Sequence, residues 1–447
     1  FYQSIRANNG NVSLVVGDDF TLAEGGSISG ADVSIAVDQT VVDFLDGGAI
    51  TIAGTLTASS SLTLSGGDDG DTFEIQALAA TTPLTIVGGS GGDDIRIGSD
   101  AGTLGGLLLA DVFVAAGDDA DDSLTLDDSG SVASRSLTLG ESTEAGYEGQ
   151  VAGFTGTVHH KGLDQLIVNL GSGADTVSVQ QSADSVWTRL NLGSGDDSAL
   201  IGVGNTLAGI LGKVSIEGEA GVDSIDVDNS AVASDTDGTL ARTSLTGFGM
   251  GDADEGLAFG TVEQMRLVLG DGANTLTLLG VGMATEASLG GGNDTLVVSG
   301  TFGNFDADIA VDGQAGTDLL SLSFDQSTSF TLDADTISSG AASGVVRYAG
   351  LESVEATLSD GPDVVTIDDA TLALTLDAGG GADLITVNDL SVATSIHLGA
   401  DNAKDQIIVV DTSAALQVEG LALGSGGGVD TLTVDRSATT AAVDGSL

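Results

Sequence analysis

The sequence contains no cysteine and very few basic residues. Only 11 of its 447 residues are Lys or Arg, against 66 Asp and Glu, which gives a formal net charge of −55. The lack of cysteine excludes disulfide bonds and thiolate metal sites. The scarcity of basic residues argues against binding to nucleic acid, to anionic membrane surfaces and to polyanionic substrates, because each of these needs a positive surface. Cationic ligands are therefore the expected partners.

Prolines, aromatic residues and long apolar runs are also scarce. Two prolines exclude a proline-rich linker, and no apolar run approaches the roughly 18 residues of a membrane-spanning helix, so we expect no membrane insertion. Hydrophobic residues still make up 41% of the chain, which is enough for a buried core and argues against a disordered acidic tail. The chain begins with Phe1 rather than Met, so we expect a processed product or a fragment of a longer protein.

One short pattern recurs along most of the chain. In NLGSGADTVSV, residues 169–179, two glycines two positions apart indicate a tight turn, and the alternation after the aspartate indicates a strand. The full pattern Gly-x-Gly-x-Asp ends on Asp93, Asp175, Asp294, Asp383 and Asp430. Looser copies centre on Asp71, Asp122, Asp197, Asp223, Asn274, Asp318, Asp363 and Asp405.

The spacing of these turns indicates a stacked repeat. Successive copies lie about 20 to 29 residues apart, except for three gaps of about twice that length. Each long gap ends in a similar sequence, which begins at His160, Phe259 and Tyr348. Helix signals are nearly absent, and each short alternating segment has one apolar face. We therefore predict an all-β parallel β-solenoid, similar to a right-handed β-helix or β-roll, in which the same turn stacks coil upon coil.

This interpretation divides the chain into three parts. Residues 1–61 keep the alternation but lack the acidic turn, so solenoid coils with plainer turns are expected there. Residues 62–435 form the acidic repeat, with double-length coils at about 123–174, 224–273 and 319–362. Residues 436–447 form a C-terminal tail.

The segment GGSGGDDIR, residues 88–96, matches the nonapeptide G-G-x-G-x-D-x-U-x in full, and the turns therefore resemble RTX, or haemolysin-type, calcium-binding repeats. In that family, Asp carboxylates and turn carbonyls hold Ca²⁺ between neighbouring coils. RTX repeats carry a calcium turn on both edges of a shorter coil, whereas one acidic turn per coil here suggests a wider β-helix with calcium on one edge. The resemblance implies calcium ligands at Asp71, Asp93, Asp175, Asp197, Asp294, Asp318, Asp363, Asp383 and Asp430.

Electrostatics favours a cation at these turns independently of the resemblance. Carboxylates stacked about 4.8 Å apart repel each other by about 3.5 kcal/mol per neighbouring pair at an effective dielectric of about 20. A hard divalent ion with oxygen ligands removes this repulsion, and extracellular calcium suits weak sites of this kind. The alternative is an Asx-turn, in which each aspartate only caps its own backbone. Asn fills that role equally well, yet Asn274 is the one amide among these positions.

We therefore expect a secreted or bacterial cell-surface protein that is calcium-stabilised and mechanical in function, without enzymatic activity. It would form a surface layer, sheath or fibre by end-to-end or lateral self-association, or alternatively the stalk of a large adhesin, with a surface glycan as a possible partner. The long coils resemble repeats of very large secreted bacterial surface proteins. A β-helix enzyme that acts on polysaccharide is a minor alternative, because 11 basic residues make a typical catalytic cluster hard to build. At His159–Lys161 we expect a ring packed at a coil corner rather than a proton-transfer site.

Overall fold

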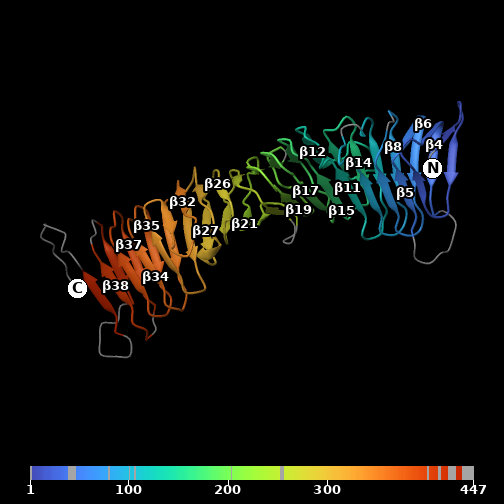
Figure 1. The fold of residues 1–447 in the computed structure, drawn as a ribbon. Coiled ribbons are helices and arrows are strands. Elements are labelled where there is room, and N and C mark those ends of the chain that lie inside the picture. The colour runs from blue at the N-terminus through green and yellow to red at the C-terminus, as the bar shows by residue number, and fades with distance from the viewer. Residues whose placement is uncertain are drawn as a thin grey trace. The chain divides into compact units, whose positions relative to one another are not determined.

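The computed structural model describes residues 3–38, 47–78, 81–99, 101–104, 107–202, 204–251, 256–399, 402–410, 414–420 and 429–434. The predicted C-terminal tail lies outside these residues. The chain forms two compact units, the first made of Phe1–Asp228 with Gly249–Gln264 and the second of Asn229–Phe248 with Met265–Leu447. Each unit consists of two long sheets, here sheet A and sheet B, whose strands alternate along the chain (Figure 1).

Among its described residues, the first unit contains twelve strands of sheet A and nine of sheet B. Those of sheet A are β1 (Ser4–Arg6), β2 (Val12–Val15), β4 (Ser27–Ala36), β6 (Thr55–Ser65), β8 (Leu84–Val87), β10 (Val112–Ala115), β12 (Ser136–Glu141), β13 (Gly149–Ala152), β14 (Val158–Lys161), β16 (Thr176–Val179), β18 (Ser198–Ile201) and β20 (Ser224–Asp228). Those of sheet B are β3 (Phe20–Leu22), β5 (Ala49–Ile52), β7 (Thr72–Ile75), β9 (Asp94–Ile97), β11 (Ser123–Asp127), β15 (Gln165–Asn169), β17 (Trp187–Asn191), β19 (Val214–Glu217) and β23 (Leu257–Gly260).

The second unit repeats this arrangement and, within its described residues, adds one short 3₁₀ helix, η1 (Phe302–Asn304). Its sheet B contains β21 (Asp237–Ala241), β22 (Ser244–Gly247), β25 (Thr275–Leu278), β27 (Thr295–Ser299), β29 (Leu319–Ser323), β33 (Ser353–Thr357), β35 (Ala373–Asp377), β37 (Thr394–His397) and β39 (Leu416–Glu419). Its sheet A contains β24 (Gln264–Val268), β26 (Ala284–Ser288), β28 (Ile309–Asp312), β30 (Ser329–Leu332), β31 (Thr336–Ser338), β32 (Val346–Ala349), β34 (Val364–Ile367), β36 (Leu384–Val387), β38 (Gln406–Val409) and β40 (Thr431–Val434).

The strands pair in parallel with the equivalent strand one coil away, so the predicted all-β parallel solenoid is confirmed. Leu62 of β6 lies beside Leu84 of β8, for example, and both side chains are at most 1% exposed. Alternate residues of each strand point between the two sheets, because successive side chains of a strand face opposite ways. The core of each unit is therefore a stack of Leu, Ile and Val layers.

The double-length coils contain a feature that the sequence did not predict, an antiparallel meander. In the first unit, β12, β13 and β14 pair antiparallel to one another, while β14 also pairs in parallel with β10 and β12 with β16. In the second unit, β30, β31 and β32 form the same meander between β28 and β34. In these two coils the extra residues form strands of sheet A, whereas in the coil at about 224–273 β21 and β22 pair antiparallel in sheet B. Parallel pairing resumes after each of these insertions.

Glycines allow the coils to approach closely at the turns, and this gives a first testable prediction. A Cβ at Gly316 would lie 1.5 Å from the carbonyl oxygen of Gly292 in the preceding coil, whereas a Cβ at Gly340 would meet nothing within 4 Å. We expect Gly316→Ala to lower the free energy of unfolding by about 1–3 kcal/mol, as overpacking does. Gly340→Ala should change it by about 0.5 kcal/mol or less. Chemical denaturation of both variants checks this, and equal effects would contradict the close stacking of the turns.

Candidate functional site

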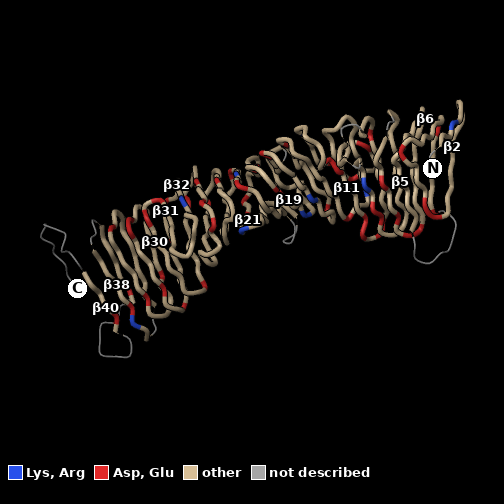
Figure 2. The backbone as a smooth tube through the Cα atoms, in the orientation of Figure 1, with Lys and Arg blue, Asp and Glu red and all other residues tan. Residues whose placement is uncertain are grey.

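The acidic turn residues are buried, and each immediately precedes a strand. All nine aspartates predicted as ligands, together with Asp122, Asp223, Asn274 and Asp405, are between 0% and 6% exposed. Most other acidic residues lie on the surface, and acidic residues recur along both units while basic residues are few (Figure 2). Burial separates these aspartates from the ordinary acidic surface of the chain, because an ionised carboxylate is rarely buried without partners.

The buried aspartates form a hydrogen-bonded ladder between coils. The backbone N–H of Asp71 donates to Oδ1 of Asp93 at 2.7 Å, and the N–H of Asp93 donates to Oδ1 of Asp122 at 2.8 Å. The same bond, with distances of 2.6 to 3.1 Å, joins Asp175 to Asp197, Asp197 to Asp223, Asn274 to Asp294, Asp294 to Asp318, Asp363 to Asp383, Asp383 to Asp405 and Asp405 to Asp430. We call these contacts the aspartate ladder. Each carboxylate thus caps the backbone of the preceding coil, whereas an Asx-turn caps its own.

One exposed acid ends the ladder before each of its three interruptions among the described residues. The sequence analysis did not identify these acids. The N–H groups of Asp122, Asp223 and Asp318 donate to carboxylate oxygens of Asp164, Glu263 and Glu352, at 2.9, 2.8 and 2.5 Å respectively. The signal was present in the similar sequences that close the three long gaps, GLDQ, TVEQ and GLES, each of which has an acid at its third position. These acids accept the same backbone hydrogen bond, but their carboxylates are exposed to solvent.

The meander moves the ladder from one edge of the coil to the other. In the first unit, Asp122 and Asp164 precede strands of sheet B, whereas Asp175 precedes β16 of sheet A. In the second unit, Glu352 precedes β33 of sheet B and Asp363 precedes β34 of sheet A. The expectation of a single acidic edge is therefore wrong within each unit. The next ladder residue follows the terminal acid by only half a coil. Its acidic turn therefore lies on the opposite edge of the coil.

The second carboxylate oxygen of most ladder aspartates is buried without a hydrogen-bond partner in the described part of the chain. This holds for Oδ2 of Asp93, Asp122, Asp175, Asp197, Asp223, Asp294 and Asp318. Two ladder residues differ, because Oδ2 of Asp71 accepts the N–H of Gly67 at 2.6 Å and Oδ2 of Asp363 accepts that of Ser359 at 3.2 Å. These two aspartates also cap their own turn.

The contacts of Asn274 show what surrounds the position that Oδ2 takes in the ladder aspartates. Its Nδ2 donates to the carbonyl oxygens of Gly270, at 3.0 Å, and of Leu289, at 2.9 Å. A similar neighbourhood is found at Asp93, because a Cβ on Gly88 would meet both Oδ2 of Asp93, at 1.9 Å, and the carbonyl oxygen of Ala116, at 2.2 Å. The position therefore suits a hydrogen-bond donor or a cation, and an ionised carboxylate oxygen there faces other oxygens.

The electrostatics of the ladder lead to the same conclusion. Burial raises the pKa of Asp93 to about 7 and that of Asp294 to about 6, although the N–H groups that donate to Oδ1 oppose the shift. Burial also raises the pKa of Asp71, Asp122, Asp175, Asp197, Asp223, Asp318 and Asp363. The repulsion of neighbouring acids adds to the effect at Asp93. Burial therefore disfavours the charged form of each of these carboxyl groups, and a proton or a bound cation would stabilise it.

The donors available to a metal ion are one carboxylate oxygen and backbone carbonyls. Within the described ranges, no group of three or more His, Cys, Asp or Glu side chains is placed to hold a metal ion. Zinc and other transition metals prefer such side-chain clusters, whereas Ca²⁺ accepts backbone carbonyl oxygens. An unpartnered buried oxygen beside carbonyls thus fits a hard, oxygen-binding cation.

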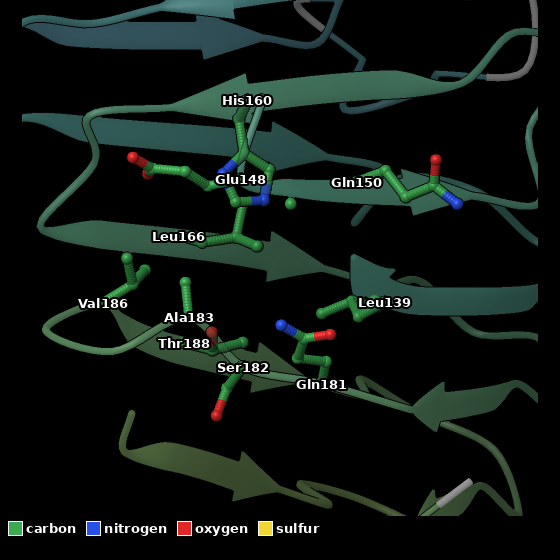
Figure 3. A pocket seen from close by; sticks show the side chains of 12 residues that line it. Leu139, Glu148, Gln150, His160, Leu166, Gln181, Ser182, Ala183, Val186 and Thr188 are labelled. Carbon is green, nitrogen blue, oxygen red and sulfur yellow. The ribbon is translucent and has the colours of Figure 1, made fainter. Parts of the chain in front are cut away.

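The histidine pair lies within β14 rather than at a coil corner. His160 is 5% exposed and borders a cavity of about 10 Å³, room for about one water molecule, between Leu139, Leu166 and Ser182 (Figure 3). Burial lowers the pKa of His160 to about 4, so the ring is neutral at pH 7. The aligned residues Phe259 and Tyr348 are buried rings as well. His160 therefore packs as a ring, as expected, although the expected corner position was wrong.

Comparisons with known proteins do not name a function. No family model matches the chain, and no curated protein sequence matches it. In the part of the chain that the structure describes, no helix is long and apolar enough to cross a membrane. The chemistry of the aspartate ladder is thus the main guide to what the chain does.

Replacing a ladder aspartate by asparagine tests the environment of Oδ2. Asp294→Asn keeps Oδ1 as an acceptor and offers carbonyls a donor, as Asn274 does, so in chelator at pH 7.5 we expect the free energy of unfolding to rise by about 1–3 kcal/mol. Asp271→Asn, which removes the same charge from an exposed turn, is the matched control and should have little effect.

The same ladder predicts how stability depends on pH when no divalent cation is present. The folded-state pKa values of Asp93 and Asp294, about 7 and about 6, lie above the ordinary Asp value near 4. Stabilisation from their bound protons is therefore complete at low pH and is lost as the pH rises through 6 to 7. The melting temperature in chelator should fall between pH 5 and pH 8, and less steeply in Asp294→Asn. A rise over this range would contradict the assignment.

Proposed function

We propose that the chain is a calcium-stabilised structural protein that works outside the bacterial cell, as a building block of a surface layer, sheath or fibre. The observation that carries this proposal is the row of buried, unpartnered Oδ2 atoms in the aspartate ladder. A chain without cysteine must stabilise its coils without disulfides, and cations bound between coils serve that purpose.

Calcium suits the ladder better than protons do at neutral pH. A carboxyl group with a pKa of about 6 or 7 loses much of its proton above pH 7, whereas Ca²⁺ with carboxylate and carbonyl ligands remains bound at millimolar extracellular concentrations. The likeness of the turns to RTX repeats supports the same ion. The ion would neutralise the carboxylate and link neighbouring coils.

The ligands follow from which Oδ2 atoms lack another partner. The strongest candidates are Asp93, Asp175, Asp197, Asp294 and Asp318, which the sequence predicted, together with Asp122 and Asp223 from the looser turns. Asp383 and Asp430 share the ladder hydrogen bonds and remain predicted ligands. Asp71 and Asp363 are weaker candidates, because each already uses Oδ2 within its own turn.

A structural role fits the chemistry better than an enzymatic one. The buried His160 is held neutral by its low pKa. Of its aligned residues, Phe259 carries no titratable group, and burial raises the pKa of Tyr348 further above neutrality. The ladder carboxylates are buried and engaged with backbone, so they are not presented to a substrate. We therefore propose that the chain is not an enzyme.

Thermal melting with and without calcium tests the proposal. At pH 7.5 the melting temperature should be clearly higher in about 5 mM calcium, a concentration that saturates weak extracellular sites, than in excess chelator. Asp294→Asn should lose part of this increase, Asp271→Asn should retain all of it, and Asn274→Asp should enlarge it by creating a further site. An unchanged melting temperature in the unmodified chain would overturn the calcium proposal.

A stalk of a large adhesin is the second candidate, favoured by the acidic surface that recurs along both units (Figure 2). Like charge on the sides opposes lateral contact between copies at low salt. A layer or fibre subunit should show concentration-dependent assembly in calcium that chelator reverses, because calcium neutralises these surfaces. Sedimentation and electron microscopy of the 447-residue chain distinguish the two: a monomer at high concentration in calcium would exclude the self-assembling subunit and favour the stalk.

A further inference from the structure

Two basic residues of the first unit, Arg189 and Lys213, share one aromatic ring instead of pairing with acids. Arg96 pairs with Asp127 and Arg135 with Asp128, and in the second unit Arg242 pairs with Asp306. Arg189 and Lys213 pair with no carboxylate among the described residues. Both instead lie over the ring of Trp187, with the guanidinium carbon 5.1 Å and the ammonium nitrogen 5.3 Å from its centroid. Among the cation–ring contacts of the described residues, Trp187 is the ring that holds two cations.

These side chains lie on the outward face of sheet B, on three neighbouring strands. Trp187 and Arg189 belong to β17, and Lys213 directly precedes β19, where Val214 pairs with Thr188. On the other side, β15 places Gln165 beside Trp187 and Asn169 beside Asn191. This face therefore presents an indole ring, two cations and amides, with Ser215 beside Arg189 and Glu217 beside Asn191. We call Gln165, Asn169, Trp187, Arg189, Asn191 and Lys213 the β17 patch. Trp187 is 40% exposed although its ring supports both cations.

A polar hollow adjoins one end of the β17 patch. It has a volume of about 200 Å³ and is lined by Asn169 and Asn191 together with Ser172, Ser194 and Glu219. Nδ2 of Asn191 donates to Oδ1 of Asn169 at 2.6 Å, which fixes both amides at its edge. From Trp187 to Asn191 the strand rises about 13 Å. A ligand that spans this length meets aromatic, cationic, amide and hydroxyl groups in turn, with the Glu219 carboxylate at the far side of the hollow.

We propose that the β17 patch and the adjoining hollow bind a short anionic saccharide, of the kind that carries carboxylates on its sugar rings. Arg189 and Lys213 supply charge-assisted hydrogen bonds to a carboxylate, and the indole ring holds both cations in place before the ligand arrives. The exposed part of the ring offers an apolar surface to a sugar ring, and the amides and serines of the hollow suit sugar hydroxyl groups. This site shares no residue with the aspartate ladder and does not depend on the calcium proposal.

Charge complementarity favours this ligand over a neutral sugar. The overall charge of −55 repels long polyanions, but this effect is screened over about 10 Å at ordinary salt concentrations. The electrostatic attraction of a short anionic ligand is therefore set by the cations near the site, Arg189 and Lys213. An acidic turn of a second copy of the chain offers carboxylates and a few serine hydroxyl groups, whereas every ring of an acidic saccharide carries several hydroxyl groups beside its carboxylate.

Trp187 is the only tryptophan, so intrinsic fluorescence reports directly on the patch. The probe is a trimer of galacturonic acid, and the matched ligand is the corresponding galactose trimer, in which a hydroxymethyl group replaces each carboxylate. Calcium and ionic strength are held fixed in all samples. We expect a saturable fluorescence change with the acidic trimer and a response at least about tenfold weaker with the neutral one, as loss of two exposed charge interactions predicts.

Charge-removing variants locate the site. Arg189→Gln with Lys213→Gln should weaken binding of the acidic trimer by about tenfold or more. The control, Arg347→Gln with Lys404→Gln, removes two exposed cations from the second unit and should leave binding unchanged. No saturable change up to about 10 mM trimer, or equal responses to both trimers, would overturn the proposal. A fluorescence shift that depends on protein concentration without saccharide, accompanied by a heavier sedimenting species, would instead identify a second copy as the occupant.

Discussion

The hydrogen bond from one coil's backbone to the next coil's buried aspartate is the contact on which the repeat depends. Each ladder N–H lies at a buried turn, where an unpaired donor would be costly. A short carboxylate side chain reaches it from the following coil, and the same bond recurs in both units. Because only Oδ1 is used, the bond leaves a second oxygen inside the protein. Pairing the N–H thus leaves a second polar atom buried without a partner at most of these aspartates, and a proton or a bound cation would stabilise it.

The antiparallel meanders limit how far this problem accumulates. Along one edge, the first unit stacks Asp71, Asp93 and Asp122 before the ladder ends on the exposed Asp164. In the second unit, the ladder that begins with Asn274 ends on the exposed Glu352. A terminal acid at the surface keeps its charge in water, where repulsion is weak. Each interruption then restarts the ladder on the other edge, so that no unit carries one unbroken row of buried carboxylates.

Net charge describes this protein poorly at the scale of a binding site. The composition argues against anionic ligands, yet Arg189 and Lys213 come together on one sheet face because β17 and β19 are neighbours in the stack. Neither residue has a charged neighbour in sequence that would mark it. The proposed saccharide site thus depends on parallel pairing, which places residues about one repeat apart side by side.

The sequence alone determined the fold class and the repeating chemistry. Period-2 alternation around a recurring acidic turn leaves little choice but stacked parallel coils, and it correctly selected Asp93, Asp175 and Asp294 as equivalent positions. Only the tertiary structure decided that these aspartates are buried, that Asp164, Glu263 and Glu352 end the ladders, and that the long coils contain meanders. The physical reason is that hydrogen bonds between coils join residues 20 or more positions apart. A local pattern specifies which residues form a turn, but the partner of each N–H is fixed only when the neighbouring coil is in place.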